Sequence, residues 1–350
     1  MSPATQRIRD RGVASVGIVG TGAISQIYFD AVAASGALEL KACSARSIVS
    51  ASPTAKKYAI AAMSLEDLLA DPEIDLVVNL TGLPQHFAIN KAALEAGKNV
   101  YSEKPLAATF AEARELLDLA AYRGLRVGCA PDTLLGGGHQ AAKALIDEGR
   151  IGTPVTAAAF LGLKAVEQFV PDPAAYFAWD AVVLDIGPYY VSQLVMMLGP
   201  VAEVTARGIV GQEGRDYPVR VPTTVSAILG FESGAQATLT LSVDAWQHSH
   251  PPLEIYGTLG TLALPDPNFF GGEPRVSVGK GPWETVPLGD RPWSEPNFEL
   301  PFGTFANYRG AGIEDLVEAI VEDRPHRASG DLAAHVLDVL ERILEECHAH

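Results

Sequence analysis

The stretch VASVGIVGTGAIS, residues 13–25, decides the fold of the first part of the chain. Its opening run, 13–20, is short, apolar and rich in β-branched residues, which predicts a buried strand. Residues 23–36 follow a helical pattern that a glycine ends. A buried strand that leads through a glycine-containing turn into a helix begins a strand–helix–strand unit, so we expect a parallel sheet here.

The same alternation continues over the first third of the chain. Further strands are predicted at 38–44, 73–82, 99–102 and 125–131, and further helices at 86–97 and 110–124. The run at 73–82 is apolar on both faces, which is typical of a central strand in a parallel sheet. We therefore predict an α/β fold for residues 1–131, a doubly wound parallel sheet with helices on both faces.

The turn between the first strand and the first helix carries a nucleotide-binding pattern. Gly20 and Gly22 match the fingerprint G-x-G-x-x-G/A, except that Ser25 occupies its last position. Gly20 permits the tight turn, and Gly22 lets the backbone approach a pyrophosphate at the N-terminus of the helix. We predict a dinucleotide site that includes Ala23 and Ile24; the alternative is an ordinary glycine turn.

The end of the second predicted strand indicates which dinucleotide binds. Ser44 and Arg46 stand there, and the segment ACSARS, residues 42–47, holds no carboxylate. An acidic side chain at this place binds the ribose 2′-hydroxyl of NAD, whereas a basic one accommodates the 2′-phosphate of NADP. The sequence therefore favours NADP over NAD, and the alternative for Arg46 is a solvated loop arginine.

The composition excludes several classes of function. The 350-residue chain holds 42 acidic and 26 basic residues, a formal charge of −16, so we expect it to bind neither nucleic acid nor membrane. Its cysteines, Cys43, Cys129 and Cys347, form no disulfide or zinc pattern, which favours the cytoplasm. We see no signal peptide and no apolar run long enough to cross a membrane.

Three segments carry a resemblance to a known family. GIVGTGAIS (17–25), NLTGLPQHFAINKAALEAGKNVYSEKPLA (79–107) and GRIGTPV (149–155) resemble the glucose-fructose oxidoreductase / inositol dehydrogenase / MocA (Gfo/Idh/MocA) family in order and spacing. The resemblance covers nearly the whole chain, and the EKP triplet at 103–105 is its most specific element. It implies a Rossmann domain followed by an α+β domain at 132–350. That second domain is built on a large open, mostly antiparallel sheet, whose face commonly mediates homodimers or homotetramers.

The resemblance also implies a chemistry. Members of the family transfer a hydride between NAD(P) and a hydroxyl-bearing carbon of a sugar, a polyol or a related small molecule. By resemblance, Lys104 reaches the reacting oxygen and the nicotinamide ribose, with Glu103 beside it at the cofactor. The segment that holds Thr81, Pro84 and His86 passes beside the cofactor as well. The alternatives are a surface ion pair for Lys104 and a helix cap for His86.

A second group of catalytic residues is expected further along the chain. The family's D-x-x-x-H segment is matched by Asp185 and, in the histidine position, by Tyr189. Helical spacing would put both side chains on one face. A free tyrosine has a pKa of about 10, so Tyr189 needs a nearby ammonium, such as that of Lys104, to act as a base. Asp185 would orient the substrate or keep Lys104 charged; the alternatives are a helix cap for Asp185 and a core-edge aromatic for Tyr189.

The remainder of the second domain is less informative. The residues Trp179, Asp180 and Ala181 stand where many relatives have a glycine-rich run, so the substrate pocket can differ from theirs. Strands are predicted at 155–163, 201–210, 223–231, 235–243 and 253–264, a mostly loop region with one hairpin at 265–303, and helices at 313–323 and 332–346. His248 and His250 would share one face of a strand, but no third ligand accompanies them at motif spacing, and we predict no metal site.

These observations together predict a cytoplasmic NAD(P)-dependent dehydrogenase that acts on the CH–OH groups of a sugar- or polyol-like substrate. Two alternatives stay open. One is a sensor that binds the dinucleotide without turnover, against which the set of Lys104, Asp185 and Tyr189 speaks. The other is a glycoside-cleaving enzyme that uses a tightly held nicotinamide for transient oxidation.

Overall fold

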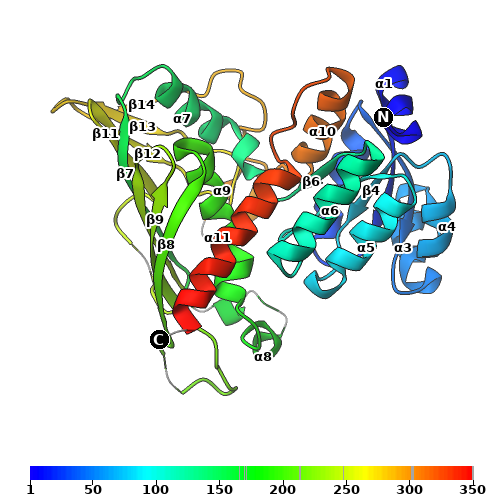
Figure 1. The fold of residues 1–350 in the computed structure, drawn as a ribbon, viewed down its shortest axis with the longest axis horizontal. Coiled ribbons are helices and arrows are strands. Elements are labelled where there is room, and N and C mark those ends of the chain that lie inside the picture. The colour runs from blue at the N-terminus through cyan, green and yellow to red at the C-terminus, as the bar shows by residue number, and fades with distance from the viewer. Residues whose placement is uncertain are drawn as a thin grey trace. The chain divides into compact units, whose positions relative to one another are not determined.

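The chain forms two compact units in a computed structural model that describes residues 1–164, 166–168, 170, 172–212, 214–246, 248–300 and 303–348. The first unit consists of Met1–Asp132 and Tyr308–Ala334, and the second consists of Thr133–Asn307 and the residues from His335 onward. Figure 1 shows their helices and strands with the labels used below.

The first unit is built on a sheet of parallel strands. Its strands are β1 (Ala14–Val19), β2 (Leu38–Ser44), β3 (Ala61–Ala62), β4 (Leu76–Asn79), β5 (Asn99–Ser102) and β6 (Val127–Cys129). They lie in the order β3-β2-β1-β4-β5-β6, and every pair is parallel. This is the strand order of the Rossmann fold, so the predicted fold of the N-terminal part is confirmed.

Helices cover this sheet. They are α1 (Pro3–Arg11), α2 (Ser25–Ala34), α3 (Ile48–Tyr58), α4 (Leu65–Ala70), α5 (Leu83–Glu95), α6 (Phe110–Arg123) and α10 (Ala311–Val321). The sequence predicted α2, α5, α6 and α10, whereas α1, α3 and α4 were not predicted. Side chains define several boundaries: Ser47 caps α3 immediately after β2, and Thr109 caps α6 in a reciprocal capping box with Glu112.

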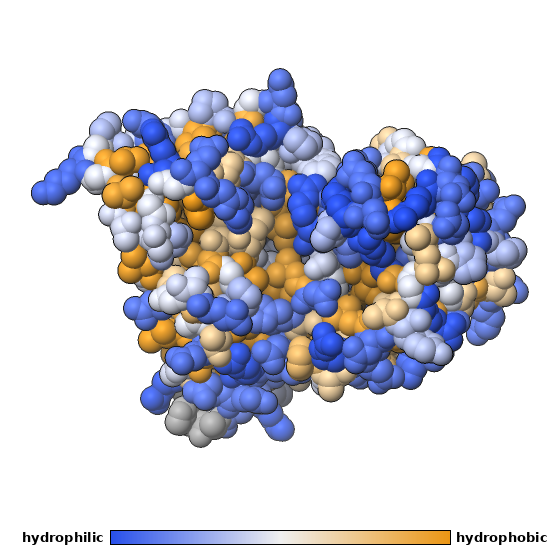
Figure 2. Space-filling model, turned by 45° about the horizontal axis from the view of Figure 1, so that its top comes forward, coloured by the Kyte–Doolittle hydropathy of each residue, from blue (hydrophilic) through white to orange (hydrophobic). Residues whose placement is uncertain are grey.

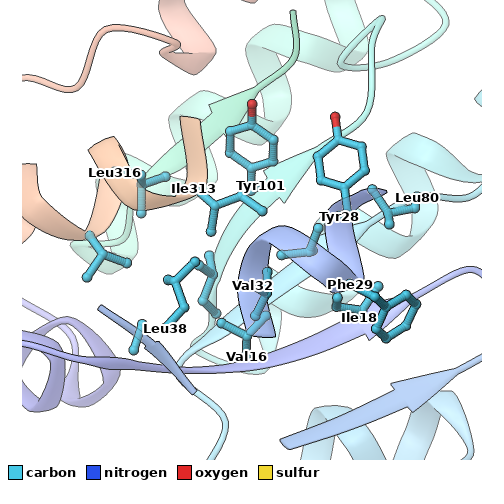
Figure 3. Packing of buried hydrophobic residues seen from close by; sticks show 14 of the residues in the cluster. Val16, Ile18, Tyr28, Phe29, Val32, Leu38, Leu80, Tyr101, Ile313 and Leu316 are labelled. Atoms are coloured by element: carbon cyan, nitrogen blue, oxygen red, sulfur yellow. The ribbon is translucent and has the colours of Figure 1, made fainter. Parts of the chain in front are cut away.

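The core of the first unit draws residues from both ends of the chain. Figure 3 shows Val16 and Ile18 of β1 beside Tyr28, Phe29 and Val32 of α2, all fully buried. The same cluster includes four fully buried side chains of α10, namely Ile313, Leu316, Val317 and Ile320. A helix near the end of the sequence therefore completes a core that begins with the first strand.

The second unit is built on a mostly antiparallel sheet. Its strands are β7 (Pro154–Gly162), β8 (Val201–Ile209), β9 (Thr224–Phe231), β10 (Gln236–Ser242), β11 (Leu253–Gly257), β12 (Gly260–Leu264), β13 (Arg275–Val278) and β14 (Glu284–Thr285). Their order is β14-β13-β12-β11-β7-β10-β9-β8. The pair β7–β10 is parallel and the other pairs are antiparallel. The predicted open sheet is confirmed, and so is the hairpin in the loop region, which joins β13 and β14.

Two details of the predicted second domain need correction. The segment 253–264 is a hairpin of β11 and β12 rather than one strand, because it reverses direction at 258–259. His248 and His250 lie in a loop after β10 rather than in a strand, with their rings stacked 4.6 Å apart. Of the region 265–303, residues 301 and 302 lie outside the described part of the chain, and residues 298–300 and 303–305 form the pair β15 (Phe298–Leu300) and β16 (Gly303–Phe305).

Helical segments complete the second unit. They are η1 (Thr133–Leu135), α7 (Gly137–Asp147), η2 (Val166–Gln168), α8 (Pro173–Tyr176), η3 (Val182–Ile186), α9 (Gly187–Leu198) and α11 (Gly330–His348), which begins in the first unit. Along β9 and β10, buried and exposed residues alternate. One face of this sheet is thus packed within the unit and the other is accessible.

The surface agrees with the charged composition of the chain. Hydrophilic residues cover most of the face that Figure 2 presents. Within the described residues, no helix combines the length and the apolar character needed to cross a membrane.

Candidate functional site

The glycine turn after β1 has the geometry of a phosphate-binding turn. Gly20 has a φ of +106°, and a Cβ there would lie 2.7 Å from the carbonyl of Leu80, so glycine is required by the protein itself. A Cβ at Gly22 would meet no atom of the described residues within 4 Å. Helix α2 begins at Ser25 without a side-chain cap among the described residues. The N–H of Ser25 donates to the carbonyl oxygen of Gly22 (3.0 Å), and the following N–H groups of the first helical turn stay available to an anion.

A cavity opens beside this turn. It has a volume of about 690 Å³ and is lined by residues from the ends of β1, β2 and β4, including Gly20, Thr21, Gly22, Ser44, Ala45, Arg46, Ser50, Thr81 and Gly82. The hydroxyl of Ser44 is buried and has no hydrogen-bond partner in the described part of the chain. A bound dinucleotide would explain three features of this cavity. It would supply a partner for the Ser44 hydroxyl and for the N-terminus of α2, and it would fill the open space at Gly22.

The predicted cofactor residues divide into two groups. Gly20, Gly22, Ser44, Arg46 and Thr81 line the cavity together. The others lie outside its lining: Ala23 and Ile24 in the exposed turn before α2, Pro84 and His86 at the start of α5, and Glu103 and Lys104 after β5.

The turn that carries Lys104 is held by Glu103. The Glu103 side chain is 9% exposed. Its Oε1 accepts a hydrogen bond from the hydroxyl of Tyr28 (2.6 Å), and its Oε2 accepts one from the main-chain N–H of Lys104 (2.9 Å). Glu103 therefore acts on the backbone of Lys104, and its contact with a cofactor stays a prediction. Lys104 itself is half-buried.

His86 supports the same turn from the other side. Its ring is buried, with Nδ1 2.6 Å from the carbonyl oxygen of Pro105 and Nε2 2.9 Å from that of Thr81. The side chain therefore bridges the segments after β4 and β5 and does not cap its own helix. Its direct contact with the cofactor stays a prediction.

Two asparagines that the sequence did not single out join these segments. Asn79, at the end of β4, accepts hydrogen bonds from Thr81 and donates to the side chain of Asn90 (2.8 Å). Asn90 in turn donates to the hydroxyl of Ser102 (3.0 Å) and to the carbonyl of Leu106. Asn79 could have been found from the sequence, because it is a polar residue at the end of an otherwise apolar strand. A buried amide at such a place indicates hydrogen-bond partners nearby.

Asp185 and Tyr189 belong to the second unit. Asp185 lies in the π-helical segment η3, and Tyr189 lies in the first turns of α9; both are half-buried. The N-cap position of α9 is Ile186, so Asp185 is not the helix cap that the sequence allowed. One oxygen of Asp185 accepts a long hydrogen bond (3.4 Å) from the hydroxyl of Tyr176. π-Helical turns frequently occur at functional sites.

Tyr176 is a donor rather than a base. Burial raises its pKa above the usual range, and the negative charge of Asp185 adds to this effect. The phenol therefore stays protonated and directs its hydrogen at Asp185.

Residues 176–181 include Trp179, Asp180 and Ala181, where the sequence departs from the family pattern, and aromatic side chains pack closely around them. Phe177 contacts Tyr176 edge to face, with ring centroids 5.2 Å apart, and stacks on Tyr217 at 5.6 Å. The guanidinium of Arg215 covers the ring of Phe177 at 4.9 Å. Its side chain is only 5% exposed and pairs with Glu167 (2.8 Å) and Asp244 (2.9 Å). Half-buried Trp179 extends this aromatic cluster, with its ring 6.4 Å from that of Tyr176.

Comparison with known proteins identifies the family. Residues 14–130 match the "Oxidoreductase family, NAD-binding Rossmann fold", and residues 139–263 match the "GFO/IDH/MocA C-terminal domain". The chain belongs to the Gfo/Idh/MocA oxidoreductase family. The resemblance stated from the sequence is confirmed, and at the level of the family so is the prediction of an NAD(P)-dependent dehydrogenase.

Individual relatives extend this result. The chain is 27% identical to trans-1,2-dihydrobenzene-1,2-diol dehydrogenase of Sus scrofa over 310 residues, which cover 87% of this chain and 89% of that protein. An NAD-binding oxidoreductase from Klebsiella pneumoniae has a TM-score of 0.85 at 23% identity and 97% coverage of each chain. Levoglucosan dehydrogenase in complex with NADH and levoglucosan has a TM-score of 0.81 at 20% identity, with 96% of this chain and 97% of that chain covered. These two structures share the fold of both units.

Proposed function

We propose that the protein is an NAD(P)-dependent dehydrogenase that transfers a hydride between nicotinamide and the hydroxyl-bearing carbon of a sugar-, polyol- or diol-like small molecule. The observation that carries the proposal is the glycine turn, in which Gly22 leaves open space beside an uncapped helix N-terminus. The names of the relatives support the substrate class, because they are dehydrogenases of a dihydrodiol and of an anhydrosugar.

Each proposed catalytic side chain has a separate task. Bound nicotinamide would accept the hydride or supply it. The ammonium of Lys104 stabilises negative charge on the substrate oxygen, and Tyr189 exchanges the hydroxyl proton. Asp185 orients the substrate, and the protonated Tyr176 keeps its carboxylate in place.

The proposed cofactor is NADP, with NAD as the alternative. Arg46 is exposed at the rim of the cavity, directly after β2, and Ser44 and Ser50 line the same cavity. A guanidinium at the end of the second strand suits a 2′-phosphate, and within ACSARS no carboxylate competes for the ribose.

The remaining proposals concern the setting of the enzyme. We propose that residues 1–131 bind the dinucleotide and residues 132–350 the substrate. A second copy of the chain would cover the accessible face of the large sheet, giving a homodimer or homotetramer; Ile209 and Ile228, which share this face, are 53% and 52% exposed. A reducing cytoplasm suits Cys43, Cys129 and Cys347, which are buried and free.

The test follows the near-ultraviolet absorbance of reduced nicotinamide. Protein is mixed with NADP+ or NAD+ and a panel of sugars, polyols, anhydrosugars and diols, beside Lys104→Ala. We expect turnover with one class of substrate and NADP+, and a fall of about 10²–10⁴-fold in kcat in the variant, because a charged group acting in the transition state is lost.

Two other results would contradict the proposal. Equal activity in Lys104→Ala would remove the lysine from the mechanism. Binding of the dinucleotide without turnover of any substrate would indicate a sensor, whereas cleavage of glycosides without release of reduced cofactor would indicate the glycoside-cleaving enzyme.

A further inference from the structure

A cluster of four polar side chains is buried in the first unit next to the turn of Lys104. Its members are Tyr28, Tyr101, Glu103 and Asp132, which are between 0% and 9% exposed. They come from α2, from β5 and its end, and from the segment after β6. Tyrosine and carboxylate groups at this depth require a reason, because their burial costs free energy unless they are hydrogen-bonded.

A hydrogen-bond chain crosses this cluster from α2 to Lys104. The hydroxyl of Tyr28 donates to Oε1 of Glu103 (2.6 Å), and Oε2 of Glu103 accepts the main-chain N–H of Lys104 (2.9 Å). Figure 3 shows the Tyr28 ring rising from α2 with its hydroxyl directed away from the apolar cluster. Helix α2 is the helix whose first turn adjoins Gly22. The chain of bonds therefore links the proposed pyrophosphate helix to the backbone of the proposed catalytic lysine.

The electrostatics favour a persistent bond. Burial raises the pKa of Tyr28 well above its usual value, and the negative charge of Glu103 raises it further. The phenol thus remains a donor at every physiological pH, and a bond from a phenol to a carboxylate is among the stronger hydrogen bonds in proteins. Loss of this donor would leave a buried carboxylate oxygen with one partner fewer.

We propose that Tyr28 is a positioning residue, which acts through Glu103 to fix the main chain of Lys104 and couples the placement of the lysine to the dinucleotide-binding helix. The inference rests on the proposed function for the role of Lys104. It predicts that the hydroxyl of Tyr28, which lies in the core, affects the chemical step more than it affects cofactor binding.

The neighbouring Tyr101 provides a matched control. Both tyrosines are fully buried in the same core cluster, and Figure 3 shows both hydroxyls pointing the same way. The Tyr101 hydroxyl makes no hydrogen bond to Glu103 within the described residues; its polar neighbour is the carboxyl group of Asp132. Tyr28→Phe and Tyr101→Phe therefore remove the same atom from the same core, but only the first removes a bond to Glu103.

The experiment compares these two variants of the full-length protein by two readouts. The first is kcat and KM for the dinucleotide. We expect Tyr28→Phe to lower kcat by about 10–100-fold with KM within about threefold, since small misplacements of a catalytic group cost this much. We expect Tyr101→Phe to stay within about twofold of wild type in both.

The second readout is hydrogen exchange of the main chain around Lys104, which is independent of turnover. We expect the Lys104 amide to exchange about tenfold faster in Tyr28→Phe than in Tyr101→Phe, because its acceptor Glu103 is no longer held. Glu103→Gln keeps an acceptor oxygen in place and should give an intermediate exchange rate at Lys104. This second variant tests the same link if Tyr28→Phe fails to fold.

The outcomes separate the inference from the proposed function. Equal exchange rates and equal kcat in the two tyrosine variants would overturn the positioning role of Tyr28. Full activity of Lys104→Ala would overturn the proposed catalytic lysine, and faster exchange in Tyr28→Phe would then still support the link to the turn.

Discussion

At the scale of single residues, burial sets the chemistry of titratable side chains. His139, in α7, is fully buried, and its Nε2 donates a hydrogen bond to the carbonyl oxygen of Phe269 (2.8 Å). Burial lowers its pKa from 6.5 to about 4. The folded protein thus keeps a neutral imidazole at a pH where the unfolded chain takes up a proton.

This shift predicts acid sensitivity. As the pH falls from about 6.5 towards 4, His139 binds a proton in the unfolded state but stays neutral in the folded state. The free energy of unfolding should therefore fall by about 3 kcal/mol over this range. Replacing His139 by Gln removes the titration. Urea denaturation at pH 7 and pH 4.5 should show a smaller loss of stability in His139→Gln than in wild type.

The exposed His250 supplies the control for this measurement. His250→Gln should lose as much stability between the two pH values as the wild type does, because this exposed substitution leaves buried His139 unchanged. An identical pH dependence of His139→Gln and wild type would show that burial of His139 does not matter.

At the scale of elements, a single carboxylate fixes the start of α10. Asp132 lies after β6 and is 1% exposed. Its Oδ2 accepts the N–H groups of Gly310 (2.8 Å) and Gly312 (2.9 Å) at the N-terminus of the helix. Burial raises the pKa of Asp132, so the stability that this group contributes is largest below its usual pKa and declines as the pH rises through its folded value. Near neutrality, the hydrogen bonds from Gly310 and Gly312 offset part of the free-energy cost of burying the charged carboxylate.

The bond count predicts how substitutions at Asp132 behave. Asp132→Ala leaves two buried N–H groups without an acceptor and should lower the free energy of unfolding by about 2 kcal/mol, measured by urea denaturation at pH 7. Asp132→Asn keeps an acceptor oxygen without the buried charge and should lose about half as much. Asp118→Ala, an exposed member of an i, i+4 pair on α6, should change stability by less than about 0.5 kcal/mol. A loss no larger in Asp132→Ala than in Asp118→Ala would contradict the cap.

At the scale of the whole molecule, the first unit is discontinuous in sequence. Its sheet comes from the first 132 residues, whereas α10 joins it from beyond residue 308. Leu316 of α10 is fully buried in the cluster of Figure 3, beside Ile313 of the same helix and Tyr101 of β5. The Rossmann unit therefore depends on a segment that is translated after the entire second sheet.

Two substitutions on α10 test this dependence. Leu316→Ala removes a fully buried side chain and should cost about 2–5 kcal/mol in the free energy of unfolding, together with weaker dinucleotide binding at elevated temperature. Val321→Ala removes a side chain that is 39% exposed on the same helix and should cost less than about 1 kcal/mol. Denaturant unfolding with and without NADP+ gives the free energy of unfolding and the stabilisation that the dinucleotide adds. Equal losses of stability in Leu316→Ala and Val321→Ala would contradict the burial of α10 in this core.

Several features of this protein follow from the sequence alone. The strands 38–44 and 99–102 match β2 and β5 residue for residue, because each short run follows a helical pattern that a glycine ends, which is a local signal. The glycine turn was equally clear, since the φ of Gly20 and the space at Gly22 depend on residues close in sequence and on one approach to Leu80. The family and both fold types were predicted from the same local motifs and their order.

Other features were decided only by the tertiary structure. Tyr28 and Glu103 are 75 positions apart, and Asp132 and Gly310 are 178 apart. No periodicity or motif indicates such a pair. In the sequence alone, Tyr28 is interpreted as a core aromatic residue, Glu103 as a charge at the end of a strand and Asp132 as a turn residue. The same holds for Arg215, which meets Glu167 and Phe177 only when three loop segments fold together. Local spacing thus determined the elements and the cofactor turn, while long-range packing in a water-excluded interior determined which polar groups meet and what each does.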